Sequence, residues 1–421
     1  MKILWVVNIP FAGMIEIAES EKQNTSGSWL SAALDGFIGK DDVSLMIVTS
    51  GRVKTIKEIK QKNITYCIIP GGYPFEYKYK SKKNKIYWDK IKNSYKPDII
   101  TIWGTEFTHG YLALKVLNDI PSVIYIQGLL ESISRYYLSG ISRKEILDSI
   151  TIRDIIKLDW ITKAQKSYYK RSRIEAEMIR LSGNVIVENN WCSSHCYQIN
   201  SVCKIYRCEL DVRSEFFEKK WDKENMLRFT IMSNAAGYPI KGLHILIKAL
   251  RIVVKEYPKA MLLIPGNGHL INSNILKKIK ESGYSRYIRR LIISFGLQNN
   301  VSFIGSKTFE EMADSMSKSN VVVIPSSIEN HSSTLIEAMI VGVPCVASYV
   351  GGIPEYVRHE YNGLLYRFEE YEMLALYIKK IFSDIVYATS LGNNACQSMR
   401  ESRSSDSINS KLMSIYKDII S

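Results

Sequence analysis

Short apolar runs alternate with helix-like stretches along the first half of the chain. The runs are unbroken rather than alternating in polarity, which is typical of strands buried on both faces of a parallel sheet. Helical segments separate most of them, so a doubly wound α/β domain is predicted here. The predicted strands are 2–8, 42–48, 64–69, 98–103, 122–127 and 184–189.

A second series of strands follows the charged stretch 213–225, which we interpret as a domain boundary. Apolar residues at helical spacing over 243–254 predict a helix with one buried face, closed by Pro258, and 408–419 shows the same spacing. The second set of predicted strands is 228–233, 260–266, 301–305, 320–325 and 343–348.

The length of 421 residues exceeds the roughly 250–300 at which one core stops growing, so two domains are expected. We place them at 1–215 and 216–400, with 401–421 as a C-terminal helix that packs back toward the first. Hydrophobic residues make up 46% and charged residues 23%, as in soluble enzymes. No apolar run approaches the ~20 residues of a membrane span, and the N-terminus is typical of a strand rather than a signal peptide. A cytoplasmic location is expected.

The formal net charge of +14 favours phosphate-bearing partners. Residues 77–96 hold eight lysines, one acid and interleaved aromatics, and 163–173 is also basic. Such stretches suit an anionic membrane surface at the inner face of the cell membrane, or simply a solvated face. No nucleic-acid recognition motif accompanies them, so no nucleic-acid partner is expected.

The seven cysteines have no disulfide spacing and are expected to be reduced. Four of them cluster with a histidine, but tight Cys-x-x-Cys pairs are missing. Buried thiols are therefore favoured over a zinc site. The cluster is Cys192, His195, Cys196, Cys203 and Cys208.

The strongest candidates for ligand binding lie in "PSSIENHSSTLIEAMIVGVPCVAS", residues 325–348. A strand ends at Pro325, and a helix should begin near Ser332 or Ser333 and end at Gly342. The amides of 333–335 would then point outward at the positive end of a helix dipole, at a sheet edge where α/β folds bind ligands. Glu329 and Glu337 flank that anion site with seven residues between them. Carboxylates accept hydrogen bonds from sugar hydroxyls, although two solvated glutamates would have the same spacing.

These motifs, with "GGIPEYVRHEYNGLLY" at 351–366, resemble the C-terminal signature of retaining glycosyltransferases of family 4, which have the two-Rossmann GT-B fold. The resemblance covers most of 228–366. It implies an α/β protein with two Rossmann-like domains facing across a cleft, the first for the acceptor and the second for the donor. The donor is a nucleotide-diphosphate sugar, and the acceptor is a saccharide or a lipid-linked saccharide.

The resemblance also implies roles for individual residues. Glu337 would hold the donor ribose and Glu329 the donor sugar. Lys241 would bind the diphosphate together with Ser332, Ser333 and Thr334, and His331 could touch the leaving phosphate. The remaining implied donor contacts are Gly27 and Ser28 in the loop after the first strand, Gly266 at a close turn, and Lys307 near the base.

Two positions depart from the family pattern. Asn234 stands in the turn where an Arg is usual, so Lys241 would carry the phosphate charge nearly alone. Gln127 stands where a catalytic-site His is frequent, and since Gln cannot titrate, its role would be hydrogen bonding. Glu106 and His109, which follow another strand, are candidate acceptor contacts.

No Asp-x-Asp occurs in the chain, so we expect no metal and no cofactor. The sequence favours a metal-independent retaining transfer from a UDP-sugar, with a GDP-sugar as second choice, in surface polysaccharide or glycolipid synthesis. Alternatives are a nucleotide-sugar 2-epimerase on the same fold and a non-enzymatic sugar-nucleotide scaffold.

Overall fold

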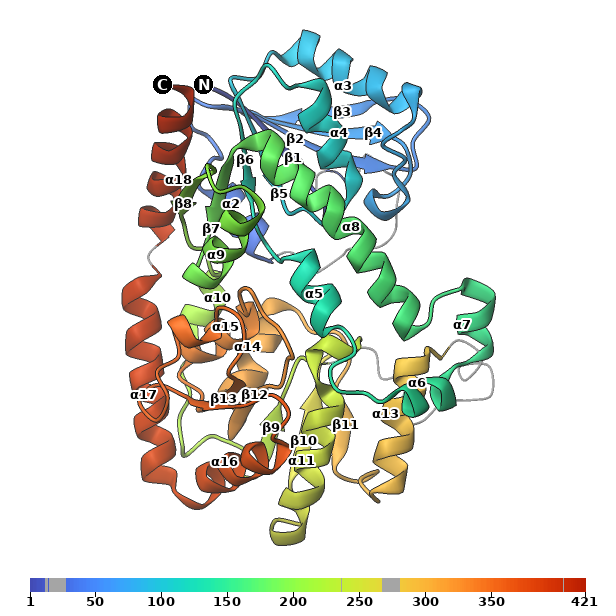
Figure 1. The fold of residues 1–421 in the computed structure, drawn as a ribbon. Coiled ribbons are helices and arrows are strands. Elements are labelled where there is room, and N and C mark those ends of the chain that lie inside the picture. Colours follow the sequence, from blue (N-terminus) through green and yellow to red (C-terminus); the bar gives the residue numbers. More distant parts are fainter. Residues whose placement is uncertain (12–13, 15–27, 236, 267–280, 404) are drawn as a thin grey trace. The chain divides into compact units, whose positions relative to one another are not determined.

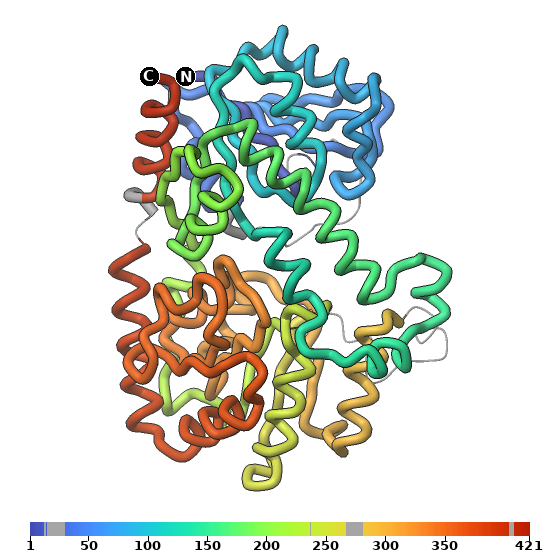
Figure 2. Tube along the Cα trace, in the orientation of Figure 1, coloured from blue at the N-terminus to red at the C-terminus, as the bar shows by residue number. Residues whose placement is uncertain are grey.

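The structure is a computed structural model of residues 1–421, and it describes all of them except 12–13, 15–27, 236, 267–280 and 404 (Figure 1). The chain forms two compact units. The first consists of 1–131, 169–212 and 403–421, and the second of 132–168 and 213–402. Both marked chain ends belong to the first unit (Figure 2). The division differs from our sequence-based boundaries mainly in 132–168, which groups with the second unit, as do 213–215 and 401–402.

The first unit is built on an eight-stranded sheet in the order β3-β4-β2-β1-β5-β6-β7-β8. Every pairing is parallel except that of β3 with β4. The six predicted strands are confirmed, whereas the short, half-exposed β3 and β8 were missed because they lack apolar runs. The strands are β1 Lys2–Val7, β2 Ser44–Gly51, β3 Lys57–Gln61, β4 Ile64–Pro70, β5 Ile99–Trp103, β6 Ser122–Tyr125, β7 Asn184–Val187 and β8 Lys204–Arg207.

The second unit is built on a six-stranded, all-parallel sheet in the order β11-β10-β9-β12-β13-β14. This is the Rossmann order, and the five predicted strands are confirmed. The strands are β9 Thr230–Met232, β10 Met261–Ile264, β11 Val301–Phe303, β12 Val321–Ile324, β13 Cys345–Ser348 and β14 Leu364–Tyr366.

Helices connect the strands in both units (Figure 1). Up to β9 they are α2 Ser28–Asp35, α3 Lys82–Tyr95, α4 Thr108–Val116, α5 Leu130–Tyr136, α6 Arg143–Ser149, α7 Ile152–Lys157, α8 Ile161–Ser182, α9 Asn190–Ile199 and α10 Ser214–Glu218. Beyond β9 they are α11 Leu243–Glu256, α13 Gly283–Ser294, α14 Phe309–Ser317, α15 Ser333–Val341, α16 Tyr371–Ser383, α17 Ile385–Ser402 and α18 Ser405–Ile420. Single-turn 3₁₀ helices lie at Pro74–Glu76, Pro239–Lys241 and Ile353–Glu355.

Helix α18 completes the core of the first unit. Ile408, Leu412 and Ile415 are buried there, as their spacing predicts. The Tyr416 hydroxyl accepts hydrogen bonds from the Trp5 indole at 3.0 Å and the Thr101 hydroxyl at 2.8 Å. The helix is thus tied to β1 and β5, the two central strands of the sheet.

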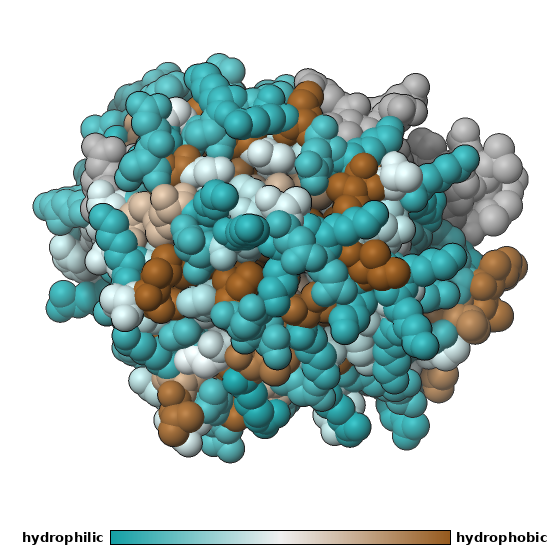
Figure 3. Space-filling view, turned by 90° about the horizontal axis from the view of Figure 1, so that it is seen from above, coloured by the Kyte–Doolittle hydropathy of each residue, from teal (hydrophilic) through white to brown (hydrophobic). Residues whose placement is uncertain are grey.

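The aromatic residues of the basic stretch 77–96 face the core rather than the surface. Tyr77 and Trp88 are buried and joined by a hydrogen bond of 3.0 Å, and the Tyr95 hydroxyl donates to the Ser44 carbonyl at 2.6 Å. The idea that these rings line a membrane surface is wrong for Tyr77 and Trp88. Hydrophilic side chains dominate the face drawn in Figure 3, with apolar ones scattered among them. No helix in the described part of the chain has both the length and the apolar character of a membrane span.

Candidate functional site

The candidate donor site lies at the carboxyl edge of the second sheet, where the strand order reverses between β9 and β12. Asn234 follows β9, and Ser326 and Glu329 follow β12. Open parallel sheets bind ligands at this switch point because the loops of neighbouring strands diverge there. The fold therefore brings the predicted residues Asn234 and Glu329 to an edge that suits ligand binding.

Lys241 and Glu329 form the central contact of this edge. The Lys241 ammonium lies 2.6 Å from Glu329 Oε1, and the Ser326 hydroxyl donates to the same oxygen at 2.6 Å. Glu329 is 8% exposed and the Lys241 side chain 29%. Burial alone would lower the pKa of Lys241, but the Glu329 carboxylate outweighs it and the pKa is raised. Lys241 therefore stays cationic and open to an anion.

The backbone of Glu329 is fixed by the Gly351–Gly352 turn. The Gly352 amide donates to the Glu329 carbonyl at 3.0 Å. Gly351 has a φ of +53°, and a Cβ there would overlap that same carbonyl oxygen. The turn after β13 thus sets the position of a residue on the loop after β12.

Helix α15 begins at Ser333 as predicted, with Ser332 at the N-cap, but the Ser332 side chain makes no capping bond. The Leu335 amide donates to the Ser332 carbonyl at 3.0 Å, which removes one of the three predicted anion-binding amides. Within the described residues, the amides of Ser333 and Thr334 have no hydrogen-bond acceptor. Two amides at the positive end of a helix dipole suit an anion.

Side chains from other loops converge on this helix start. The Asn234 amide lies 3.5 Å from the Thr334 hydroxyl. The Ser332 amide donates to the Tyr356 hydroxyl at 3.3 Å, and the His331 ring lies 6.5 Å from the Tyr356 ring. The sequence did not predict these contacts of Ser326 and Tyr356, because neither residue belongs to a recognisable charge pattern.

Glu337 lies one turn into α15 and is half-buried. In the described part of the chain no hydrogen bond reaches its carboxylate. Burial raises its pKa to about 7, and the nearby Arg213 opposes that rise. Arg213 lies in the stretch that we interpreted only as a boundary. A hydroxyl donor such as a ribose diol could satisfy this carboxylate.

The other predicted donor contacts are less well connected. The Gly266 amide donates to the Gly305 carbonyl at 2.7 Å, two residues before Lys307. Lys307 makes no ion pair with any described residue, and nothing links it to the pair of Lys241 and Glu329. Gly27 lies outside the described residues, and Ser28 is described only as the first residue of α2.

The first sheet carries a separate polar cluster at its own switch point, where β1 has β2 on one side and β5 on the other. Asn8, Gly104 and Gln127 follow β1, β5 and β6. A Cβ on Gly104 would lie 2.7 Å from the Asn8 amide nitrogen and 3.1 Å from Gln127 Oε1, so the three residues converge. The Asn8 amide also donates to the Glu106 carboxylate.

Two carboxyl groups with raised pKa values belong to this cluster. Burial raises the pKa of Glu106 to about 7 and that of Glu175, on α8, to about 8, where the Glu106 charge adds to the effect. Glu175 accepts from the Thr105 hydroxyl at 2.5 Å and the Leu130 amide at 2.9 Å. The cluster thus brings together a titratable pair that the sequence did not suggest.

His109 is a core residue. It is 1% exposed, its Nε2 lies 2.9 Å from the Val7 carbonyl, and burial lowers its pKa to about 4. A carbonyl can only accept, so Nε2 carries the proton. The prediction that His109 contacts the acceptor substrate is therefore wrong.

The described residues contain no group of three or more His, Cys, Asp or Glu side chains that could hold a metal ion. The clustered cysteines are free thiols in the core, and burial raises the pKa of Cys192 well above its usual value. They pack between strands and helices of the first unit.

Comparison with known proteins is consistent with this geometry. Residues 213–398 match the family described as glycosyl transferases group 1. An uncharacterized glycosyltransferase of Methanocaldococcus jannaschii is 28% identical over 177 residues, 42% of each chain. The aligned parts cover between 31% and 42% of the first curated relatives.

Solved structures resemble the whole chain in fold. Sucrose-phosphate synthase from Thermosynechococcus elongatus superposes with a TM-score of 0.70 at 18% identity, covering 99% of this chain and 98% of that one. HepE of Anabaena, in complex with UDP-glucose, gives 0.67 at 16% identity over 99% and 100%. Residues 213–398 therefore resemble the glycosyl transferases group 1, and the fold of the chain is GT-B.

Proposed function

We propose that the chain transfers a sugar from a nucleotide-diphosphate sugar to a saccharide or lipid-linked saccharide, with retention of anomeric configuration. The observation that carries the proposal is the pair of Lys241 and Glu329, joined at 2.6 Å on the loops beside the α15 start. A cation, two unused amides and a fixed carboxylate are the groups that a sugar diphosphate requires.

The leaving nucleoside diphosphate gains negative charge in the transition state. Lys241 and the amides of Ser333 and Thr334 are donors already in position to stabilise it, as in an oxyanion hole. Glu329, whose Oε1 is occupied by Lys241 and Ser326, can accept from a donor-sugar hydroxyl with its second oxygen. Glu337 would hold the ribose.

Retention would follow if the acceptor hydroxyl attacks from the face that the diphosphate leaves. The departing phosphate oxygen then takes the acceptor proton, the new glycosidic bond forms and the old C–O bond breaks, so no protein base is needed. This agrees with the presence of Gln127, which cannot take a proton. Protein cations and amides would replace a metal ion in this scheme.

A uridine donor is supported by HepE, which binds UDP-glucose with the same fold. The acceptor is proposed to be a precursor of a surface polysaccharide or glycolipid at the inner face of the membrane, which suits the basic charge of the chain.

The test is proton NMR of the purified protein in EDTA with a panel of UDP- and GDP-sugars. Saturation transfer to one nucleotide series, with slow release of a sugar in the donor's own anomeric configuration, is expected. Absence of binding to every donor would overturn the proposal.

The same spectra would separate the 2-epimerase alternative. An epimerase needs titratable groups beside the sugar, and the first unit has two titratable carboxyls, Glu106 and Glu175, at its sheet edge. Appearance of an epimeric nucleotide-sugar would favour it, whereas binding without any turnover would indicate a scaffold.

A further inference from the structure

Helix α7 in the second unit exposes its apolar side chains and buries an acidic one. Ile152, Ile155 and Ile156 are 71%, 60% and 77% exposed. Asp154, on the opposite face, is fully buried. Leu147 on α6 and Leu158 after α7 add exposures of 66% and 55%. Soluble monomers rarely expose large contiguous apolar patches. Five large exposed apolar side chains within residues 147–158 therefore indicate an interaction site.

The polar face of α7 holds the helix in place. Thr151 and Asp154 form a reciprocal capping box at 3.2 Å, and the Thr151 hydroxyl donates to the Glu281 carbonyl at 2.9 Å. The Arg286 guanidinium donates to the Ile150 carbonyl at 2.9 Å. The apolar side chains therefore point outward because the inward face is already bonded.

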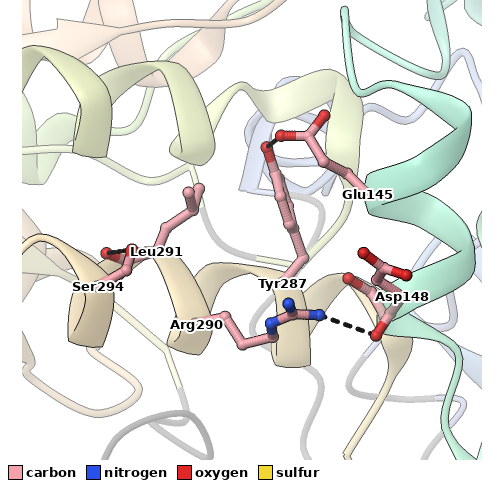
Figure 4. A pocket seen from close by; sticks show the side chains of 7 residues that line it. Glu145, Asp148, Tyr287, Arg290, Leu291 and Ser294 are labelled. Atoms are coloured by element: carbon pink, nitrogen blue, oxygen red, sulfur yellow. Dashed lines mark hydrogen bonds between the residues drawn. The ribbon is translucent and has the colours of Figure 1, made fainter.

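Helix α6 is attached to α13 in the same way (Figure 4). The Tyr287 hydroxyl donates to Glu145 at 2.9 Å, and Arg290 donates to the Asp148 carbonyl at 2.9 Å. A cavity of about 190 Å³ remains between the two helices. We call residues 142–159 the α6–α7 projection, which lies at the edge of the second unit beside α13 (Figure 1).

The projection carries four basic and four acidic side chains and so has no net charge, but its basic side chains are the less engaged of the two. Its exposed cations Arg143, Lys144 and Lys157 make no ion pair with any described residue. Most of its acids are engaged internally: Glu145 caps α6, Asp154 caps α7 and pairs with Arg153 at 3.1 Å, and Asp159 lies 3.4 Å from Arg153. Asp148 is the one acid whose carboxylate has no partner in the described residues.

We propose that the α6–α7 projection docks onto an anionic lipid bilayer, with the three isoleucines of α7 entering the interface and the lysines meeting the head groups. A small apolar tip with exposed, unpaired basic side chains in the same segment suits lipid, which needs no matching surface. A standard protein interface needs roughly 800 Å² and 20–30 residues on each side, more than this tip offers. The inference does not depend on the proposed sugar transfer.

The test is flotation of the full chain with phosphatidylcholine vesicles containing roughly one-third phosphatidylglycerol. Ile155→Ser with Ile156→Ser should lower the bound fraction about tenfold or more. The matched control is Val202→Ser with Val386→Ser, two side chains that are 88% and 77% exposed outside the projection. The control should float like the parent chain.

A second pair of variants tests the charge. Lys144→Gln with Lys157→Gln should weaken flotation severalfold at low salt and less at high salt, where screening already suppresses the attraction. Circular dichroism and melting temperature check that every variant folds. Equal flotation of the isoleucine variant and its control would overturn the proposal. Loss of a dimer in sedimentation, with flotation unchanged, would instead assign the surface to a second copy of the chain.

Discussion

The carboxyl edges of the two sheets differ in the partner of their most buried carboxylate. At the second sheet, Glu329 lies 2.6 Å from the Lys241 ammonium and a helix start points at the same edge. At the first sheet, Glu106 and Glu175 are close enough for one charge to raise the pKa of the other. Both edges are switch points of parallel sheets, so topology alone does not explain the difference.

The contrast indicates two kinds of ligand group. An edge with a cation and free amides stabilises a charged diphosphate. At the first edge the carboxyl pKa values are about 7 and 8, so these groups are partly protonated near pH 7. Such groups can both donate and accept hydrogen bonds, which suits uncharged hydroxyl groups. Four predictions test this comparison, from the largest expected effect to the smallest.

The largest effect is expected for Lys241→Ala. Loss of the cation should lower the transfer rate about 10²–10³-fold, as for removal of one oxyanion donor, because the leaving diphosphate is no longer neutralised. Steady-state kinetics against the parent chain measure it. Lys255→Ala, an exposed lysine at the end of the same α11, is the control. Parent-like turnover by the Lys241 variant would mean that the charged edge is not the donor site.

The pH dependence of stability tests the neutral edge. Burial raises the pKa of Glu175 from 4.5 to about 8, so the folded state holds more protons than the unfolded state between these values. The free energy of unfolding should therefore fall as pH rises from 4.5 to 8, by about 4 kcal/mol. Glu175→Gln should flatten this dependence in denaturant titrations, whereas Glu177→Gln, an exposed neighbour on α8, should leave it unchanged.

Glu337 tests whether the charged edge also needs an ionised acceptor for the ribose. Glu337→Gln should weaken donor binding about tenfold, or roughly 1.4 kcal/mol, at pH 8. Because burial raises the pKa of Glu337 to about 7, the parent chain should also lose affinity as pH falls below 7, and the variant should not. Isothermal titration with the donor measures both. Identical pH profiles would remove Glu337 from the site.

The smallest effect is expected for the loss of hydrogen bonds in the core of the first unit, away from the sheet edges. Tyr416→Phe leaves the Trp5 indole and the Thr101 hydroxyl without their shared acceptor. A loss of about 1 kcal/mol in unfolding free energy is expected, with donor affinity unchanged. Chemical denaturation together with donor titration gives both values. A change in donor affinity would mean that the core and the sites cannot be varied independently.

The sequence predicts local features well and long-range pairing poorly. The start of α15, its end at Gly342 and the buried face of α18 follow from capping residues and periodicity. Glu175 was missed because its partner Thr105 lies 70 residues earlier in the chain. The same helical spacing that places Glu175 inward also fits a solvated acid.

The isoleucines of α7 show that an apolar side chain on a helix need not face the core. Spacing predicts that apolar residues on a short helix face the core, yet here the cap and the ion pair of Asp154 claim the inward face. The lysine-rich stretch 77–96 has aromatic residues whose hydrogen bonds to buried groups cannot be read from composition. Polar contacts across the fold, which no local pattern encodes, decided both cases.

The bond between Trp5 and Tyr416 joins residues 411 positions apart, and this has a consequence for biosynthesis. A ribosome that adds some 5–20 residues per second exposes β1 long before α18 exists. All segments of the second unit, 132–168 and 213–402, are made before α18. The second unit can therefore close its core first, while the unit that begins the chain waits for a helix made at the end of the sequence.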